Sequence, residues 1–344
     1  MKVNNLEGLK LPSKKEEEFL KINFDPLFSQ DFKSVETLEF DIMGLEEVID
    51  ENNYTSPLFD ITRNFDIKQK ILKINTNIQE PIFLIHKIKE DDTFFTNSLK
   101  IEVGENIKAQ VVELFITSGQ NSALSINRNI HLQENANLEY VKIQDVNKTN
   151  SMLFNTSINQ DENSNLDFSN FEYGDGFIVN TASNIIEKQD VNYSINGLVK
   201  LSDDASCANL IRTTHNEKSS ISNVNYKHSL KDSSKAVFKA KSIVNESAQF
   251  SKAFQNCNTI LLSDDATIYA QPHLEIFIDE LEASHGATTG TLNKEQLLYL
   301  QSRGISKEIA YNMLLEAFEK DIAQNLKDDL VKEFVQGYDR SKYV

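Results

Sequence analysis

The chain has 344 residues, a length that suggests about two domains or one large solenoid with attachments. Hydrophobic residues make up 40% of it, which is enough to form a core. Its formal net charge of −17 argues against a nucleic-acid partner or an anionic membrane surface, because both are bound through clustered Lys and Arg. The two cysteines, Cys207 and Cys257, form no CxxC pair, which excludes a disulfide framework and a self-contained structural zinc site. With no apolar signal region and no apolar run near the ~20 residues needed to cross a bilayer, we expect a cytoplasmic protein.

Residues 1–76 have a mixed pattern and are predicted to form an N-terminal α/β arm. Ser13 stands three residues before Glu16, which is the spacing of a capping box. A short helix over 14–22 is therefore expected in this arm.

Residues 77–283 consist of short β-branched and aromatic runs, such as 138–143 and 236–240, separated by Asn, Asp and Ser. Their period-two alternation predicts strands. A phrase of two acidic or amide residues followed by Ala or Ser recurs at 134–136, 162–164, 203–205, 245–247 and 264–266. Such a repeat predicts a mainly β fold in which a tight turn precedes each strand, as in a parallel β-helix solenoid. The low number of glycines, 11, counts against a sandwich with many tight hairpins. The alternative to a solenoid remains open, because turns of Asn, Asp and Ser occur in any β protein.

Residues 284–344 change to the 3.6-residue period of helices and are predicted to form a C-terminal helical module. Asn293 can cap a first helix, with Gln296 at the third position, and Ser306 can cap a second. A third helical segment covers 326–336.

The segment 271–285 carries the highest density of side chains able to bind a metal. On a strand, His273, Glu275 and Asp279 share one face, and His285 follows. Imidazole and carboxylate groups suit Fe(II) or another borderline divalent ion. The alternative is a solvated strand face on an acidic protein.

Cys257 lies 28 residues before His285, after a strand-like run. Its thiolate could ligate iron or accept persulfide sulfur if its pKa were lowered by a cation or metal. The alternative, which we also favour for Cys207, is a buried small hydrophobic residue. The chain contains no GxxxxGK[ST], GxGxxG or GxSxG motif, so we assign it no catalytic residue and no ATP site of its own.

The order of motifs in the chain resembles the SufB/SufD family, and within it the SufD branch. The specific part covers about 255–318, with weaker support near the N-terminus. The motifs are LPSKKEE (11–17), LLSDDA (261–266), LEI (274–276), Asp279, SHGATTG (284–290), LYLQSRGI (298–305) and AF (317–318).

This resemblance implies a right-handed parallel β-helix between N-terminal and C-terminal helical regions, acting as a non-catalytic scaffold of the SUF system. It implies pairing with a SufB-type paralogue or with a second copy, and a SufC-type partner that hydrolyses ATP. Iron or an iron-sulfur cluster would be held transiently at the subunit interface, without a stably bound cofactor. A flavin in the assembled complex is also compatible with this resemblance.

The resemblance carries over to particular residues. His285 is the candidate metal residue, and the further candidate ligands for iron or a cluster are Cys257, Glu275 and His273. The ATPase is expected to dock on the C-terminal helices through Leu297, Leu298, Tyr299, Arg303, Met313, Leu314 and Phe318.

Some positions depart from the SufD pattern. Glu282 and Ala283 stand where family members often have Lys and Cys, and Cys257 looks like the cluster-building cysteine of SufB. SufB, however, usually has an acidic residue on either side of its histidine, whereas Gly286 follows His285. A SufB-like subunit, a β-helix enzyme acting on acidic polysaccharide, and a purely structural solenoid remain alternatives.

Overall fold

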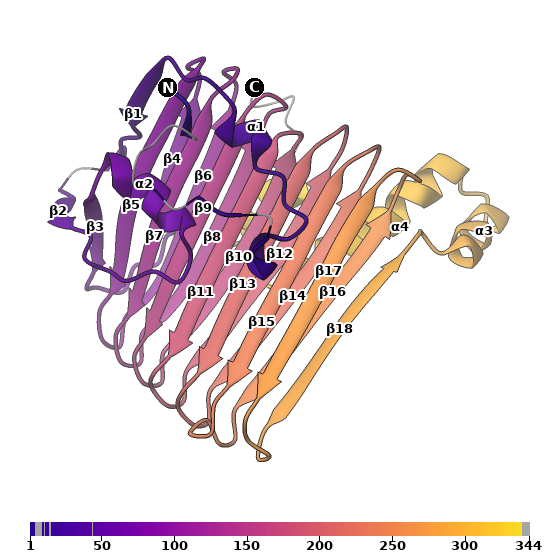
Figure 1. Cartoon of the computed structure of the whole chain (residues 1–344). Helices are drawn as coiled ribbons and strands as arrows, with labels where there is room; N and C mark the ends of the chain where they lie inside the picture. Colours follow the sequence, from indigo (N-terminus) through magenta and orange to yellow (C-terminus); the bar gives the residue numbers. More distant parts are fainter. Residues whose placement is uncertain (4–8, 10, 14, 43, 339–344) are drawn as a thin grey trace.

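Two sheets, in which every pair of strands except β2 and β3 is parallel, form the body of the protein (Figure 1). The computed structural model describes residues 1–3, 9, 11–13, 15–42 and 44–338. Sheet A contains, in spatial order, β17 (Thr267–Ile276), β15 (Lys235–Val244), β13 (Ser206–His215), β11 (Phe177–Ile186), β9 (Ser151–Gln160), β7 (Ala123–Leu132), β5 (Thr93–Val103), β3 (Lys68–Ile74) and β2 (Glu46–Ile49), with β1 (Ser34–Thr37) beside β5. Sheet B contains β18 (Glu282–Gly290), β16 (Lys252–Leu261), β14 (Ile221–Leu230), β12 (Asn192–Leu201), β10 (Asn165–Gly174), β8 (Asn137–Val146), β6 (Lys108–Thr117) and β4 (Ile82–Ile88).

The chain alternates between the two sheets, so that β3–β4 to β17–β18 form eight successive strand pairs of a β-helix. The predicted mainly β solenoid is confirmed. Its strands extend beyond the expected range of 77–283, because β3 begins at Lys68 and β18 continues to Gly290. The small polar residues of β18 form a strand because they pair with β16 along its length.

The recurring phrase forms corners of the coils. Asn135, Asn163 and Asp203 have φ values of 57°, 56° and 53°, a left-handed conformation that short polar side chains tolerate. The small residue after the first two, Ala136 or Ser164, is buried where the chain bends inward. Because Asn and Asp adopt the left-handed conformation, the coils turn with few glycines.

The interior between the sheets is filled by alternate side chains of the stacked strands, including Leu138, Tyr193 and Phe238. One glycine is required by this packing. A Cβ atom on Gly197 would lie 2.1 Å from the ring of Tyr226, its register partner on β14. The close approach fixes the position of this buried tyrosine.

The N-terminal arm covers the outer face of sheet A (Figure 1). It contains the 3-10 helix η2 (Glu17–Phe19) and the α-helices α1 (Asp25–Phe28) and α2 (Leu58–Phe65). The helix expected over 14–22 is reduced to η2, because the chain turns out of the helix at Lys21, whose φ is 77°. Residue 14 lies outside the described residues. The side-chain hydroxyl of Ser13 accepts a hydrogen bond from the backbone amide of Lys15 at 3.3 Å. Among the described residues, this is the only side-chain hydrogen bond of the expected capping box.

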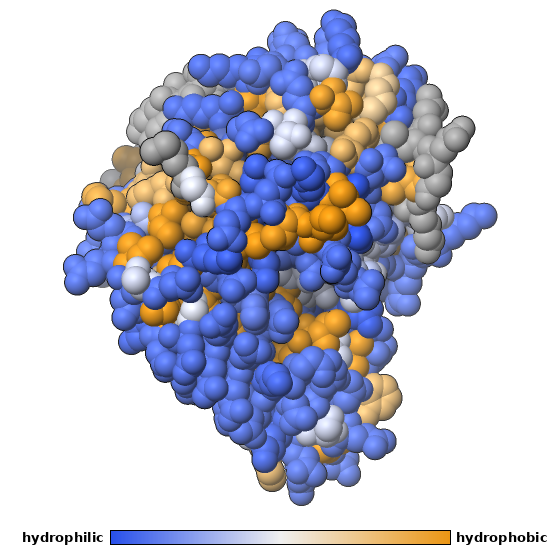
Figure 2. All heavy atoms as spheres, turned by 90° about the vertical axis from the view of Figure 1, so that its left-hand side faces the viewer, coloured by the Kyte–Doolittle hydropathy of each residue, from blue (hydrophilic) through white to orange (hydrophobic). Residues whose placement is uncertain are grey.

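The two ends of the β-helix differ. At the N-terminal end, Leu38, Phe40, Ile42 and Leu45 pack against the interior and close it. Figure 2 views this side and shows apolar surface among hydrophilic regions; exposed apolar residues near this end include Ile49 of β2. At the C-terminal end, β17 and β18 are edge strands, with no further strand paired to them among the described residues.

The C-terminal module consists of α3 (Lys294–Ser302), α4 (Lys307–Gln324) and α5 (Asp329–Gln336). The Asn293 and Ser306 caps are confirmed: Asn293 accepts hydrogen bonds from two backbone amides, and Ser306 accepts one. The third helix begins later than 326, because Asp328 is its cap. No helix in the described part of the chain is long and apolar enough to cross a membrane.

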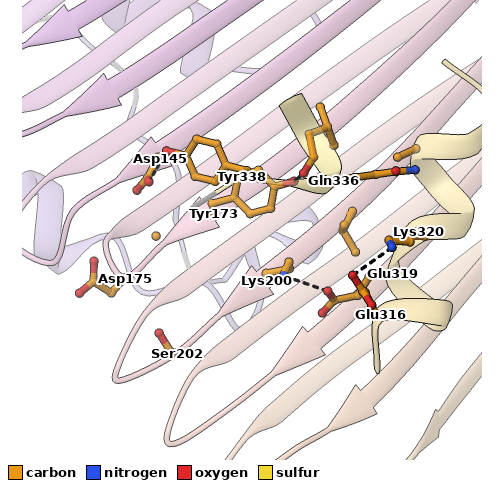
Figure 3. Close-up of a pocket in the computed structure, with 14 residues that line it drawn as sticks. Asp145, Tyr173, Asp175, Lys200, Ser202, Glu316, Glu319, Lys320, Gln336 and Tyr338 are labelled. Atoms are coloured by element: carbon orange, nitrogen blue, oxygen red, sulfur yellow. Dashed lines mark hydrogen bonds and ion pairs between the residues drawn. The ribbon is translucent and has the colours of Figure 1, made fainter. Parts of the chain in front are cut away.

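Helices α4 and α5 pack on the outer face of sheet B through Ile322, Ala323 and Val335. Figure 3 shows the cavity of about 310 Å³ that remains between these helices and the sheet. On its walls the rings of Tyr173 and Tyr338 stack at 4.7 Å, and Lys200 forms a 2.8 Å ion pair with Glu319 (Figure 3). The module is therefore attached to the β-helix by both apolar and ionic contacts.

Candidate functional site

His285 lies on the edge strand β18, at the uncovered end of the β-helix interior. In the register of the two strands it pairs with Gln255, and Ala287 pairs with Cys257. Gln255 and Cys257 are buried, so His285 belongs to the inward-facing set of β18. His285 itself is exposed, because no further coil covers it among the described residues. Its Nδ1 atom lies 3.2 Å from the carbonyl oxygen of Pro272 on the opposite sheet.

Gln255 forms the layer directly beneath His285. Its side-chain amide donates to the hydroxyl of Ser242 at 2.7 Å and to the carbonyl of His273 at 3.1 Å. These bonds connect sheet B to sheet A across the interior. The last full layer of the β-helix is thus closed by a polar bridge, and His285 lies on its outer side.

Cys257 is fully buried beside His228 of β14, with 3.7 Å between the sulfur and Nδ1. Burial raises the pKa of the Cys257 thiol to about 12, and burial lowers the pKa of His228 to about 3. Both groups are therefore neutral, and this contact does not produce a thiolate. The strand spacings place Cys257 about 8 Å from His285, measured between Cα atoms. The two residues share one side of sheet B but differ in exposure.

His273 and Glu275 lie on the outer face of sheet A, away from His285. Glu275 forms an ion pair with Lys241, with 2.7 Å between Oε1 and Nζ. The Nε2 atom of His273 lies 3.3 Å from the same carboxylate oxygen. Hydrogen bonding from Lys241 lowers the pKa of Glu275. Asp279 was expected on the same face, but β17 ends at Ile276, so Asp279 follows the strand. The structure thus places His273 and Glu275 on the outer face of sheet A, His285 at the end of sheet B and Cys257 in the interior.

Within the described residues, no group of three or more His, Cys, Asp or Glu is arranged to hold a metal ion. His285 can offer one imidazole nitrogen at the end of the β-helix.

Helices α3 and α4 expose apolar side chains to solvent. The exposed fractions are 65% for Leu298, 58% for Tyr299 and 45% for Met313. Arg303 is also exposed and donates a hydrogen bond to the Tyr299 hydroxyl at 3.2 Å. Leu297 and Leu314, two further residues expected to dock a partner, are half-buried.

Phe318, the remaining residue expected to dock a partner, is half-buried and contacts Lys227 of sheet B. The ammonium of Lys227 is 4.8 Å from the centre of its ring and donates to its carbonyl at 3.0 Å. The same ammonium forms an ion pair with Asp321 at 2.7 Å. Phe318 therefore connects α4 to the β-helix.

Sequence reasoning missed two ionic clusters in the interior. In the first, Glu113 is contacted by His86 at 2.8 Å, by Arg128 at 2.5 Å and by the hydroxyl of Tyr140, all fully or nearly fully buried. Burial alone would raise the pKa of Glu113, but Arg128 and the hydrogen bonds hold it well below its usual range. The sequence signal that could have revealed this cluster is the presence of charged residues, such as Glu113 and Arg128, at strand positions that alternate with buried apolar residues.

The second cluster contains Lys142, Glu172 and Cys207. The Cys207 thiol donates to Glu172 at 2.6 Å, and Lys142 donates to Asn180 at 2.7 Å. Burial raises the pKa of Cys207 well above its usual value, and burial lowers that of Lys142 to about 8. Cys207 is a core residue, as expected from the sequence.

Comparison with known proteins identifies the family. The model of the SufBD core domain of the SUF system for FeS cluster assembly matches residues 86–318, more than half of the chain. The chain belongs to the SufBD family.

Relatives within this family include SufD proteins. The iron-sulfur cluster assembly protein SufD of Escherichia coli is 25% identical over 236 residues, covering 68% of this chain and 56% of the relative. SufD of Plasmodium falciparum is 25% identical over 299 residues, covering 83% of this chain and 20% of the relative. A SufBD family protein of Methanothermobacter thermautotrophicus is 38% identical over 90 residues, covering 26% of this chain and 22% of the relative. The chain thus spans about half the length of the E. coli protein and less of the others.

Proposed function

We propose that this SufBD family protein is a SufD-like scaffold subunit for iron-sulfur cluster assembly and has no catalytic activity of its own. The observation that carries the proposal is the asymmetry of the β-helix. Its N-terminal end is closed by apolar residues, whereas its C-terminal end presents two edge strands and the exposed His285.

The edge strands β17 and β18 supply a surface for pairing with another β-helix. Unpaired strand edges have backbone donors and acceptors available for a second chain. Tyr269, Ile276 and Phe277 are exposed large apolar side chains near this end, so pairing would also bury apolar surface. A SufB-type paralogue is the proposed partner, and a second copy of this chain is the alternative.

His285 is the proposed ligand of the chain at that interface. It offers one nitrogen on the outer side of the Gln255 bridge, so the partner would provide the remaining ligands for iron or for the nascent cluster. His273 and Glu275 lie on the other sheet and are not part of this proposal. Cys257 is a poor candidate for the cluster-building thiol of a SufB subunit, because its thiol is buried and its pKa is raised.

Helices α3 and α4 are the proposed docking site for a SufC-type ATPase, since Leu298, Tyr299 and Met313 form exposed apolar surface on a helical pair. Phe318 and Lys227 connect α4 to β14 of the β-helix. A movement of the docked ATPase could therefore be transmitted to sheet B. Flavin binding remains a prediction, and it concerns the assembled complex rather than this chain alone.

The proposal is tested by co-expressing the chain with a SufC-type ATPase and a SufB-type paralogue. A complex that contains all three chains and hydrolyses ATP is expected. The matched sample replaces the ATPase with a variant lacking its Walker lysine, and it should form the complex without hydrolysis. Failure of the chain to co-purify with both partners would contradict the scaffold role and favour a structural solenoid.

A further inference from the structure

A carbonyl oxygen holds the ring of His285 at the open end of the β-helix. The Nδ1 atom of the ring lies 3.2 Å from the backbone oxygen of Pro272, which belongs to the facing strand β17. A carbonyl oxygen can only accept a hydrogen bond, so the hydrogen in this contact is on Nδ1. A neutral imidazole has one N–H group, which leaves Nε2 with a lone pair. The contact thus selects one of the two tautomers of His285.

The other ring nitrogen of His285, Nε2, has no hydrogen-bond partner among the described residues. The ring is exposed, so a group from solvent or from another chain can reach this atom. Histidines that bind metals almost always donate their second ring N–H to a carbonyl, a carboxylate or a water, which fixes the ring and makes the binding nitrogen more basic. His285 has this arrangement within its own chain.

Pro272 explains why an unpaired carbonyl is present at this place. Proline has no backbone N–H, so in a sheet it occupies an edge strand, at a position whose N–H side faces away from the neighbouring strand. Pro272 lies on β17, the last strand of sheet A in the part of the chain that the structure describes. The N–H and C=O groups of one strand residue point to the same side, so the Pro272 carbonyl faces the open edge. In that part of the chain no further strand competes with His285 for it.

The bridge formed by Gln255 fixes the backbone of β17 beside Pro272. The side-chain amide of Gln255 donates to the carbonyl of His273, the residue after Pro272, at 3.1 Å. It also donates to the hydroxyl of Ser242 at 2.7 Å. Gln255 is buried and pairs in register with His285. The strand beside β18 is therefore bonded to the strand that supplies the acceptor for His285.

His273 provides a comparison on the outer face of β17. Its Nε2 atom lies 3.3 Å from a carboxylate oxygen of Glu275. Hydrogen bonding from Lys241 lowers the pKa of Glu275, so this carboxylate is ionised and only accepts. In the neutral ring of His273 the hydrogen is therefore on Nε2. The two exposed histidines of the last coil thus have opposite tautomers.

We infer that the Pro272 carbonyl holds His285 in the tautomer protonated on Nδ1, and that Nε2 is the nitrogen with which His285 binds iron or a cluster. Pro272 and Gln255 are positioning residues, because they act through His285. The choice of nitrogen rests on the proposed ligand role, whereas the tautomer is a property of the chain alone. A strand that pairs with β17 gains no backbone hydrogen bond from Pro272, so pairing at this edge leaves the contact intact.

Nitrogen NMR of the full chain labelled with ¹⁵N-histidine tests the tautomer. Spectra are recorded at about pH 9, above the usual titration range of histidine. The signals are assigned by their loss in His285→Gln and in His273→Gln. We expect the hydrogen on Nδ1 of His285 and on Nε2 of His273, each with a preference of about fivefold or more, the amount given by one net hydrogen bond. A His285 ring protonated on Nε2, or equal populations of its two tautomers, overturns the inference.

Gln255→Met tests the positioning role with the same measurement. Loss of the bridge should bring the tautomer ratio of His285 toward one, while the signals of His273 report that β17 remains folded. Asn256→Met is the matched control, because Asn256 is the next residue of β16 and is exposed on the opposite face. The control should keep the tautomer ratio of the original chain. An unchanged ratio in Gln255→Met would show that Gln255 does not position His285.

The choice of nitrogen is tested in the anaerobically reconstituted three-chain complex. Histidine labelled with ¹⁵N at Nε2 alone, or at Nδ1 alone, is incorporated into this chain. Electron–nuclear double resonance of the reduced cluster should show strong coupling from the Nε2 label, and this coupling should be absent in His285→Ala. Coupling from the Nδ1 label would overturn the inference and leave the ligand role standing. Coupling from neither label would overturn the ligand role, and with it the choice of nitrogen.

Discussion

Gln255 and His285 occupy paired positions on β16 and β18, yet one is buried and the other is exposed. Gln255 is covered by His285 and bonded across the interior, while His285 has no strand beyond it among the described residues. The end of the solenoid thus converts an interior position into a surface position. This difference underlies the proposal that His285 acts at an interface.

The first prediction concerns the edge of the solenoid. Phe277→Glu should weaken co-purification with the paralogous subunit, because Phe277 is 58% exposed next to the end of β17 and would be buried on pairing. Size-exclusion chromatography with light scattering measures the change. Phe250→Glu is a matched control, since Phe250 is 62% exposed at the preceding corner. Unchanged co-purification of Phe277→Glu would place the pairing surface elsewhere.

The second prediction concerns the C-terminal helices. Leu298→Glu should reduce ATPase binding by roughly tenfold or more, because a charge would replace an apolar contact at the centre of the proposed surface. Leu330→Glu on α5 is the control, as Leu330 is 74% exposed but lies on another helix. Surface plasmon resonance with immobilised ATPase compares the two. Unchanged binding of Leu298→Glu would place the docking site elsewhere.

The third prediction concerns the ionic cluster in the interior. Arg128→Met should destabilise the chain by about 3–5 kcal/mol, because Glu113 would remain buried without its cation. Arg212→Met should change stability by less than about 0.5 kcal/mol, since Arg212 is exposed. Urea unfolding of both variants gives the two values. Equal stability of the two variants would show that Glu113 finds another partner or becomes protonated.

The fourth prediction concerns pH. The pKa of His228 is lowered from 6.5 to about 3 in the folded chain, so between these values the unfolded state binds the additional proton. Stability is therefore lost as pH falls below about 6.5, by about 2 kcal/mol at pH 5. His228→Gln lacks this contribution. Urea unfolding at pH 7 and pH 5 should show a smaller loss for the variant, and identical losses would contradict the assigned cause.

The recurring corner phrase and the family resemblance together were sufficient to predict the solenoid, and the corners themselves are local. Asn135 and Asn163 adopt left-handed conformations that depend on their own short side chains, and Asn293 and Ser306 cap helices within three residues. The N-terminal arm was harder to predict. Its capping signal at Ser13 and Glu16 was overridden by the turn at Lys21 and by packing on sheet A.

The candidate site was predictable only as separate residues. Strand alternation correctly placed His273 and Glu275 on one face, but it could not show that His285 lies on the other sheet. The pairs Glu113–Arg128 and Lys142–Asn180 depend on contacts between strands, which no local pattern records. Their positions become visible only when the register of the coils is known.

The central claim is that His285 is a ligand at the subunit interface. The most direct measurement is the iron and acid-labile sulfide content of the anaerobically reconstituted three-chain complex, compared between His285→Ala and His131→Ala. His131 lies on β7, in the third of the eight strand pairs counted from the N-terminal end, and is partly exposed beside Asp161. We predict that both variants form the complex and that only His285→Ala loses the cluster. Full cluster content in His285→Ala would contradict the ligand role.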